Sequence, residues 1–288
     1  MADIGFIGLG LMGAGFTKRL VSSGHRVLGY DLNSAKVAEA QGWGVVPAGS
    51  PGEAAAGGAL VFVCVTTSGA VREVVLGLAA AGGLAGKTVV DVSTTEMGIT
   101  REIAAAVAAA GGAFLDAPVS GGPPAAEAGT LAIMLGGEEA AFEQARPVLE
   151  QLGLATHMGP TGAGQATKLV NQALCLTNYV ICAEGLRLAE AYGVDASRIP
   201  AALAPGLGNS AVLQAIFPRI VAKDYAPRGY ARQILKDLEL VHEATRAQHL
   251  AMPMLSQALT MFRLMVSQGK SELDGAGIVT LLPEAEPH

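Results

Sequence analysis

Three glycines near the amino terminus have the spacing that lets a protein backbone approach a phosphate group. The segment Gly8-Leu9-Gly10-Leu11-Met12-Gly13 fits the pattern Gly-x-Gly-x-x-Gly. In a dinucleotide site, one glycine permits a tight turn, one lets the backbone approach the pyrophosphate, and one lets a helix pack closely on a strand. The helix that begins there also offers amides and its positive dipole end to phosphates. Because the chain contains 38 glycines, an ordinary tight turn remains an alternative.

An acidic residue follows this motif at the distance that a dinucleotide requires. Asp31 lies 18 residues after Gly13, at the end of the second expected strand. A carboxylate there can accept hydrogen bonds from both ribose hydroxyls of NAD, although a solvated turn residue is the alternative. The same carboxylate would repel the 2′-phosphate of NADP, and no arginine follows it, since Lys36 is the only nearby basic residue. The sequence therefore predicts a dinucleotide site that favours NAD, with NADP as the alternative.

A lysine in the second half of the chain could transfer the proton that accompanies hydride transfer at an alcohol carbon. Lys168 lies in the first turns of a long apolar segment, and Asn171 and Gln172 share its face at i+3 and i+4. Partial desolvation there would disfavour the charged amine, as a general acid or base requires. A surface lysine packed along apolar neighbours is the alternative. The histidines have less suitable surroundings, with His157 interpreted as structural, and we predict no metal site because no His/Cys cluster has ligand spacing.

Two further segments carry groups that could hold a substrate. Ser120, Gly121 and Gly122 follow an expected strand and offer a hydroxyl and two backbone amides to a carboxylate. A simple connection between a strand and a helix would look the same. Lys236 precedes Asp237 in a later helix, where such a pair is usually a solvated charge patch.

Short apolar runs alternate with helical patterns through the first 160 residues. A helix start is expected at Ser50, which can cap it, with Pro51 in the first turn and Glu53 completing a capping box. The alternation predicts βαβ units and a mostly parallel sheet. The expected strands are Ile4–Gly8, Arg26–Tyr30, Leu60–Val65, Thr88–Val92, Ala113–Asp116, Leu131–Leu135 and Leu154–His157.

The pattern changes after Gly164. Residues 165–191 contain no proline and one glycine, which predicts a single buried helix about 40 Å long. We expect an α/β domain over residues 1–162 that binds the dinucleotide, and an all-helical domain over residues 163–288 for substrate binding and oligomerisation. The other expected helices of the second domain are Ala196–Ala204, Ala211–Val221, Tyr230–Gln248 and Pro253–Gln268.

The overall composition limits the possible partners and surroundings. A net charge of −6 argues against broad binding to nucleic acid or to anionic membranes. Mean hydropathy is +0.41, but no run of about 18 strongly apolar residues appears. Three cysteines without framework spacing suit a reducing compartment. We therefore expect a soluble cytoplasmic protein, and the apolar helices predict a homodimer or homotetramer.

Four segments, taken together, resemble the β-hydroxyacid dehydrogenase family, which includes 3-hydroxyisobutyrate dehydrogenase, tartronate semialdehyde reductase and L-threonate dehydrogenase. The segments are Gly5–Gly13, Asp116–Gly122, Gly164–Gln172 and Lys236–Leu238, in an order that spans nearly the whole chain. The resemblance implies an α/β Rossmann domain followed by an all-α domain, joined by a long interdomain helix. It also implies hydride transfer between a nicotinamide cofactor and a small 3-hydroxy acid. The alternatives are an NADPH-dependent semialdehyde reductase, an L-threonate-type dehydrogenase and, remotely, a non-enzymatic dinucleotide-responsive regulator.

The resemblance also implies roles for individual residues. Lys168 would be the catalytic base in oxidation and the acid in reduction, and Asn171 would orient the substrate beside it. Lys236 would approach both cofactor and substrate. The substrate carboxylate would be bound by Ser120, Gly121 and Gly122. The nicotinamide side of the cofactor would be bordered by Val65, Thr66 and Thr94.

The chain departs from the family pattern at several positions. Many members carry Leu-Pro where this chain has Val65-Thr66, and the common Asn-Asn pair is Asn171-Gln172 here. The segment Gly208-Asn209-Ser210 resembles the threonate-type branch, so Asn209 could contact substrate hydroxyls or could instead cap a helix. Imine reductases share the architecture but usually replace the lysine, and Lys168 therefore argues against that activity.

Overall fold

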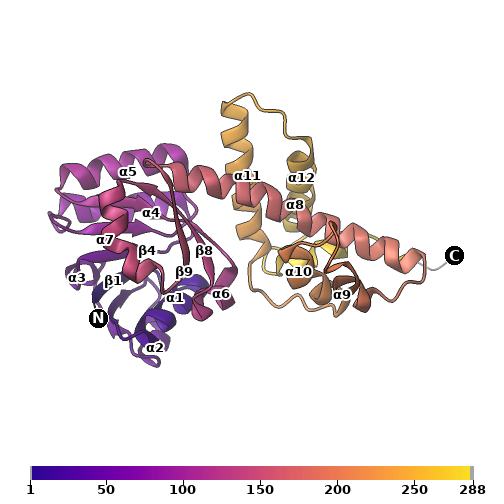
Figure 1. Ribbon diagram of the computed structural model, residues 1–288, viewed down its shortest axis with the longest axis horizontal. Helices are drawn as coiled ribbons and strands as arrows, with labels where there is room; N and C mark the ends of the chain where they lie inside the picture. Colours follow the sequence, from indigo (N-terminus) through magenta and orange to yellow (C-terminus); the bar gives the residue numbers. More distant parts are fainter. Residues whose placement is uncertain (1, 286–288) are drawn as a thin grey trace. The chain divides into compact units, whose positions relative to one another are not determined.

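The computed structural model describes residues 2–285 of the chain. It divides into two compact units, Met1–Lys168 and Leu169–His288. Helix α8 (Ala163–Ala191) begins in the first unit and continues into the second (Figure 1). The expected domain limits at residues 162 and 163 remain a prediction.

Among the described residues, the first unit forms a nine-stranded sheet with helices on both faces (Figure 1). The strands are β1 (Asp3–Ile7), β2 (Arg26–Tyr30), β3 (Val46–Pro47), β4 (Leu60–Val63), β5 (Thr88–Asp91), β6 (Ala113–Asp116), β7 (Val119–Ser120), β8 (Leu131–Gly137) and β9 (Gly153–Gly159). The helices before α8 are α1 (Leu11–Ser22), α2 (Ser34–Gln41), α3 (Pro51–Ala56), α4 (Ser68–Ala80), α5 (Met97–Ala109), α6 (Gly122–Ala128) and α7 (Glu139–Leu149).

The strand order brings the candidate loops to one edge of the sheet. The order is β3-β2-β1-β4-β5-β6-β8-β7, and β9 pairs with β8. Strands β1 to β6 are parallel to one another, whereas β8 runs antiparallel to β6 and β7. Because parallel strands end at the same edge, the loops after β1, β2, β4, β5 and β6 lie along it. This is the dinucleotide-binding arrangement that the motifs predict.

Alternate side chains of the central strands pack into two separate cores. In β4, Phe62 packs with Phe6 and Phe16, while the adjacent Val61 packs with Val71 on the opposite face. Helices α1, α6 and α7 cover the first face, and α3, α4 and α5 cover the second. A sheet buried on both faces requires strands that are apolar throughout, which explains their continuous apolar runs.

The seven expected strands are all present, with small shifts at their ends. Strands β3 and β7 were not expected, because two residues are too short to show a period-two pattern. The helix expected at Ser50 is α3, where the Ser50 hydroxyl accepts a hydrogen bond from the Glu53 amide at 3.1 Å. The Glu53 carboxylate accepts a hydrogen bond from the Gly49 amide at 2.7 Å. The second hydrogen bond of the capping box therefore comes from the residue before the cap rather than from Ser50 itself.

Within its described residues, the regular elements of the second unit are helices. After α8 come η1 (Ala196–Arg198), α9 (Ile199–Leu203), α10 (Ala211–Val221), α11 (Ala231–Ala247), α12 (Pro253–Ser267) and η2 (Gly275–Leu281). The helix expected over Ala196–Ala204 is thus η1 followed by α9. A core built on Phe217, Leu238 and Phe262 joins these elements. No helix within residues 2–285 has the length and apolar character needed to cross a membrane.

Candidate active site

The glycine loop after β1 has the geometry of a dinucleotide cradle. Gly8 adopts a φ of +102°, and a Cβ placed there would lie 2.1 Å from the Cys64 carbonyl oxygen. A Cβ on Gly13 would lie 2.0 Å from the Gly8 carbonyl oxygen, so α1 could not pack against this turn with a larger residue. At Gly10, by contrast, a Cβ would meet no heavy atom within 4 Å. The chain itself thus requires glycine at positions 8 and 13, and the open approach at Gly10 fits a bound pyrophosphate.

The acidic residue at the end of β2 contacts this loop directly. One carboxylate oxygen of Asp31 accepts the Leu9 amide at 2.7 Å, and the other accepts the Asn33 amide at 2.8 Å. These bonds hold the carboxylate beside the glycine loop while leaving each oxygen a further acceptor position. Leu32, the next residue, is 93% exposed.

Lys168 lies beside the loop that was predicted to bind a carboxylate. Its side chain is buried, and its Nζ donates a hydrogen bond to the Val119 carbonyl oxygen at 2.7 Å. Ser120 is the next residue, so the amine is one peptide unit from the Ser120-Gly121-Gly122 segment. Gly121 and Gly122 have φ values of +133° and +73°, which other residues rarely adopt. The geometry therefore brings together Lys168 and the predicted carboxylate loop, and it excludes the surface-lysine interpretation.

The residues predicted beside the nicotinamide lie in the loops after β4 and β5. Val65 donates its amide to the Ser93 hydroxyl at 3.0 Å, which joins the two loops. Thr66 and Thr94 follow in the same two loops. Cys64 is partly buried beside Asp91, and burial raises the pKa of its thiol to about 12, so the thiol stays protonated.

Three buried residues of this edge were not among the predicted site residues. Gln165 donates from its Nε2 to the Ser93 carbonyl oxygen at 2.8 Å, and its Oε1 accepts the Thr95 amide at 3.0 Å. Burial raises the pKa of Asp91 to about 6, against the opposing effect of hydrogen bonds from Thr95 and Ser93. Burial also raises the pKa of Asp116, although backbone amides at the start of α8 donate to it. The only sequence signal for these residues was their position inside apolar or glycine-rich motifs.

Within the second unit, several polar residues form a chain of contacts between α8 and α11. The Asn171 amide nitrogen donates to Gln172 Oε1 at 2.8 Å, and Gln172 Nε2 donates to the Asp237 carboxylate. Asp237 also forms an ion pair with Lys236 at 3.0 Å. This pair is partly buried, with exposed fractions of 29% for Lys236 and 16% for Asp237, and is therefore not a fully solvated charge patch.

The segment around Asn209 is held locally within the second unit. Its amide nitrogen donates to the Ala204 carbonyl oxygen at 2.9 Å, and its amide oxygen accepts from Gln214 at 2.7 Å. The cap of α10 is Ser210, whose hydroxyl accepts the Leu213 amide at 3.0 Å. The interpretation of Asn209 as the cap is therefore wrong, since the next residue has that role. A role for Asn209 in substrate binding remains a prediction.

The histidines examined as possible acids or bases have structural contacts. His157 stacks on Phe142 at a centroid distance of 5.5 Å and bonds to the Gly137 carbonyl oxygen. His25 accepts the Ala2 amide on Nδ1 and contacts Gln151 through Nε2. In the described part of the chain, no group of three or more His, Cys, Asp or Glu residues could hold a metal ion.

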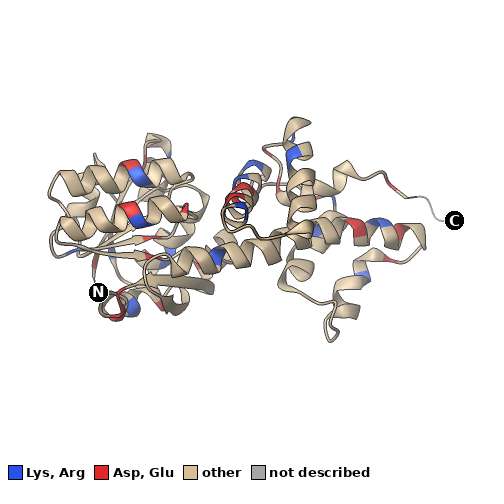
Figure 2. Cartoon of the chain, turned by 90° about the horizontal axis from the view of Figure 1, so that it is seen from above, with Lys and Arg blue, Asp and Glu red and all other residues tan. Residues whose placement is uncertain are grey.

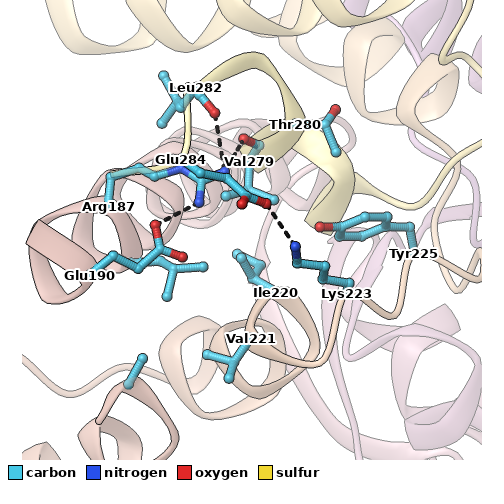
Figure 3. Close-up of a pocket in the computed structure, with 12 residues that line it drawn as sticks. Arg187, Glu190, Ile220, Val221, Lys223, Tyr225, Val279, Thr280, Leu282 and Glu284 are labelled. Atoms are coloured by element: carbon cyan, nitrogen blue, oxygen red, sulfur yellow. Dashed lines mark hydrogen bonds and ion pairs between the residues drawn. The ribbon is translucent and has the colours of Figure 1, made fainter. Parts of the chain in front are cut away.

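A separate cavity of about 410 Å³ lies in the second unit (Figure 3). Its charged residues are paired, with Arg187 bonded to Glu190 and Lys223 to Glu284 (Figure 3). Tyr225 faces the same hollow, and none of the lining residues is a predicted site residue. The cavity is therefore distinct from the glycine loop and from the Lys168 contact.

The fold and the edge of the sheet define a class of protein: a Rossmann-type dinucleotide-binding oxidoreductase with an added helical unit. Residues 3–159 match the family described as the NAD binding domain of 6-phosphogluconate dehydrogenase. Residues 162–282 match the family described as the NAD-binding domain of NADP-dependent 3-hydroxyisobutyrate dehydrogenase.

Individual relatives match over nearly their whole length. The NAD-dependent L-serine dehydrogenase of Pseudomonas aeruginosa is 35% identical, with 95% of each chain covered. The 2-hydroxy-3-oxopropionate reductase of Escherichia coli is 33% identical, covering 97% of this chain and 96% of the relative. A solved structure of Mycobacterium tuberculosis 3-hydroxyisobutyrate dehydrogenase with L-serine superposes with a TM-score of 0.87 at 31% identity, covering 98% of this chain and 99% of that one.

The chain belongs to the β-hydroxyacid dehydrogenase family. The expected fold, enzyme class and nicotinamide dinucleotide cofactor are thereby confirmed, and the alternative of a non-enzymatic regulator is set aside.

Proposed function

We propose that this protein reversibly oxidises the hydroxyl group of a small 3-hydroxy acid with NAD, and that Lys168 is its general acid and base. The observation that carries the proposal is the 2.7 Å hydrogen bond from Lys168 Nζ to the Val119 carbonyl oxygen. This bond places the amine directly beside the Ser120-Gly121-Gly122 loop. A group that transfers a proton and a loop that can hold a carboxylate are thus adjacent, as a short hydroxy acid requires.

The Ser120 loop would hold and orient the substrate. The Ser120 hydroxyl and the amides of Gly121 and Gly122 can donate to a carboxylate in the conformation that the two positive φ values fix. A 3-hydroxy acid carries its hydroxyl two carbons from its carboxyl carbon. An acid bound at this loop would therefore present its hydroxyl close to Lys168.

Lys168 would move the proton at that hydroxyl. In oxidation, the neutral amine accepts the hydroxyl proton at Nζ, and in reduction the ammonium returns it to the carbonyl oxygen. The bond to the Val119 carbonyl oxygen orients the amine, and the burial of the side chain excludes competing water. The bound nicotinamide accepts or supplies the hydride.

Residues of the second unit would complete substrate recognition. Asn171 follows Lys168 by three residues on α8, so helical spacing directs both side chains to the same face. Its contact with Gln172 fixes the orientation of its amide. We propose Asn171 as the substrate-orienting residue, and Lys236 and Asn209 as further contacts.

The cofactor preference would be set at the end of β2. Asp31 can accept the ribose hydroxyls of NAD, and its fixed carboxylate would repel the 2′-phosphate of NADP. We therefore propose NAD as the preferred cofactor. The second candidate function is an NADPH-dependent semialdehyde reductase or an L-threonate-type dehydrogenase, and the similarity to the E. coli reductase favours reduction as a possible direction.

The assay that tests this proposal measures initial rates with NAD and with NADP. The oxidation panel is 3-hydroxyisobutyrate, L-serine, D-glycerate and L-threonate, and the reduction panel contains tartronate semialdehyde with NADH or NADPH. We expect one 3-hydroxy acid to give kcat/KM above about 10⁴ M⁻¹ s⁻¹ with NAD. A strong preference for NADPH and the semialdehyde would support the second candidate, and no activity on any member of either panel would contradict both.

The assembly and surroundings of the protein are part of the same proposal. We propose a homodimer or homotetramer in the cytoplasm, without nucleic acid or membrane partners. The support for assembly is an exposed apolar stripe on the second-unit part of α8. The support for the absence of polyanionic partners is the net charge of −6.

A further inference from the structure

The side chain of Gln165 joins the loop after β5 to the helix that carries Lys168. It is 1% exposed, and its two hydrogen bonds go to the Thr95 amide at 3.0 Å and the Ser93 carbonyl oxygen at 2.8 Å. These two partners flank Thr94, the residue predicted beside the nicotinamide. Gln165 thus holds the backbone on both sides of Thr94 from a position one helical turn before Lys168.

Two buried carboxyl groups hold the parts that Gln165 connects. Asp91 accepts the Ser93 amide at 3.0 Å and the Thr95 hydroxyl at 2.7 Å, which fixes the loop. Asp116 accepts the amides of Gly162 at 2.7 Å and Gln165 at 2.8 Å, which fixes the start of α8. Asp91 and Asp116 are register neighbours on β5 and β6. The loop and the helix start are therefore each attached to the sheet, and the Gln165 amide links them to each other.

We propose that Gln165 is a positioning residue that sets the separation between Thr94 and the Lys168 amine. Gln165 and Lys168 are three residues apart on α8, so a change in the pitch or rotation of its first turns moves both side chains together. The proposed function requires hydride transfer beside Thr94 and proton transfer at Lys168 on the same substrate carbon and its hydroxyl. This inference rests on that function. It makes the separation between Thr94 and the Lys168 amine depend on Gln165, a residue that contacts neither substrate nor cofactor.

A purely structural role for Gln165 would give a different result. Loss of two buried hydrogen bonds would lower the thermal midpoint in either case. A structural role would leave kcat of the folded enzyme unchanged, whereas misplacement by about 1 Å costs on the order of 100-fold in rate. The readout is therefore kcat measured well below the melting temperature, together with the dissociation constant for NADH.

Two substitutions separate these roles. Gln165→Leu removes both bonds, and we expect kcat to fall about 10- to 100-fold at every pH with NADH affinity changed less than about threefold. Gln165→Glu keeps the acceptor for Thr95, but its second oxygen faces the Ser93 carbonyl oxygen. When protonated, the introduced carboxyl can donate there and restore both bonds; when ionised, it cannot.

The Gln165→Glu variant should therefore recover activity as the pH falls. The introduced carboxyl would contact the loop that Asp91 holds and lie on the helix start that Asp116 holds, with the Cys64 thiol near Asp91, and burial together with these acids favours its protonated form. Because Asp91 itself has a pKa of about 6, each rate is divided by the wild-type rate at the same pH. We expect this ratio to rise at least fivefold between about pH 9 and pH 6, while the Gln165→Leu ratio stays constant.

Gln151→Leu is the matched control. Gln151 also bridges two segments, through His25 and the Pro147 carbonyl oxygen, but it lies beside the amino-terminal end of β2. The Gln151→Leu substitution should lower the thermal midpoint without changing kcat. Hydrogen–deuterium exchange of residues 92–97 is measured in parallel, and only the Gln165 variants should show faster exchange there.

The outcomes distinguish the inference from the proposed function. If Lys168→Ala is inactive but Gln165→Leu keeps more than half of the wild-type kcat, the positioning role is wrong and the proposed function stands. A pH-independent ratio for Gln165→Glu also overturns the positioning role. If the wild-type enzyme oxidises no acid of the panel, the proposed function fails. In that case, unchanged hydrogen–deuterium exchange of residues 92–97 in Gln165→Leu overturns the inference. Faster exchange there supports the connection that Gln165 makes between the loop after β5 and α8.

Discussion

Gly10 and Asp31 are single residues that indicate a ligand, since the packing of the protein itself does not require them. Nothing in the protein opposes a side chain at Gly10, so the open approach there fits a ligand. The Asp31 carboxylate is held by the Leu9 and Asn33 amides beside that approach. Together these residues would account for dinucleotide binding by the first unit and for a choice between NAD and NADP.

Cofactor preference should change when the charge at the end of β2 changes. The double substitution Asp31→Asn with Leu32→Arg removes the repulsive carboxylate and supplies a guanidinium for a 2′-phosphate. We expect kcat/KM with NAD to fall about 10- to 100-fold and that with NADP to rise by a similar factor. Leu32→Ala is the control, since this exposed side chain should have little effect alone. An unchanged NAD-to-NADP ratio in the double variant would show that Asp31 does not select the cofactor.

Asp91 should make stability depend on pH. Its pKa is about 6 in the folded protein against 3.8 in the unfolded chain, because burial disfavours the ionised form. The folded state therefore retains the proton more strongly, and the stability that this provides is lost as the pH rises from 3.8 to about 6. Above that range the ionised carboxylate lowers the free energy of unfolding by a constant amount, on the order of 3 kcal/mol.

Asp91→Asn removes this titration while keeping a polar group of the same shape. We expect the melting temperature of the variant minus that of wild type to increase between about pH 4 and pH 7, measured by scanning fluorimetry. Thr95→Val keeps the carboxyl group but removes a hydrogen bond that lowers its pKa, so the stability of this variant should still fall as the pH rises, over a range that extends above that of wild type. A difference for Asp91→Asn that does not vary with pH would contradict the assignment.

At the residue scale, sequence motifs indicated candidate ligand-binding residues but not the buried residues that hydrogen-bond beside them. Lys168 and Ser120 belong to segments whose residue types indicate chemistry. Gln165 and Asp91 were visible in the same segments, yet a buried glutamine gives no periodic or chemical signal of its partners. Its role depends on a contact between residues 165 and 93, which only the folded chain brings together.

At the scale of elements, α8 and α11 are joined by a polar contact inside the second unit. Gln172 is buried and bonds to Asp237, which pairs with Lys236. The departure from the common Asn-Asn pair is therefore structural in this chain, because a glutamine reaches α11.

Shortening this side chain should weaken the connection between the two helices. Gln172→Asn withdraws the amide by one methylene and leaves a partly buried Asp237 carboxylate oxygen without this donor, which costs about 1–3 kcal/mol. The free energy of unfolding from urea titration measures the loss. Gln257→Asn, the same substitution at an exposed position of α12, is the control and should change it by less than about 0.5 kcal/mol. Equal stability of Gln172→Asn and wild type would show that the contact contributes nothing.

Element boundaries followed from the sequence where local signals were strong. Strands β2 and β6 and helix α10 have the expected limits, because apolar runs and capping residues define them. The two-residue strands β3 and β7 depend on pairing with a distant neighbour. Such pairing has no counterpart in the local pattern, and so it could not be predicted.

At the scale of the whole molecule, the second unit exposes an apolar stripe along α8. No charged residue occurs over positions 169–183, which Figure 2 draws as a long tan stretch of this helix. The spacing of the exposed residues corresponds to whole helical turns, so they form one continuous face. They are Val170, Leu174, Ile181, Leu188 and Tyr192, each at least 49% exposed. A face of this kind usually marks a protein–protein interface.

Charged residues placed in the centre of this stripe should prevent assembly. We expect wild type to be a dimer or tetramer by light scattering at micromolar concentration, and the Leu174→Glu, Ile181→Glu double variant to be smaller. Leu250→Glu is the control, since Leu250 is also exposed but lies outside the stripe. A wild-type monomer, or an assembly unaffected by the double substitution, would contradict the proposed interface.

The general architecture of both units was predictable because it follows from repeated local patterns. Alternating strands and helices indicated the sheet, and an uninterrupted apolar segment indicated α8. Substrate choice was not predictable in this way, since it depends on how side chains from distant parts of the chain lie around a bound acid.

The central claim is that Lys168 transfers the proton in a nicotinamide-dependent oxidation of a small hydroxy acid. The most direct measurement compares wild type, Lys168→Ala and Lys168→Arg for kcat with NAD and the best acid of the panel, and for NADH binding by fluorescence. We predict that both variants bind NADH within about threefold of wild type, while kcat falls about 10²- to 10⁴-fold. Retention of wild-type kcat by Lys168→Ala, with normal folding and NADH binding, would contradict the account.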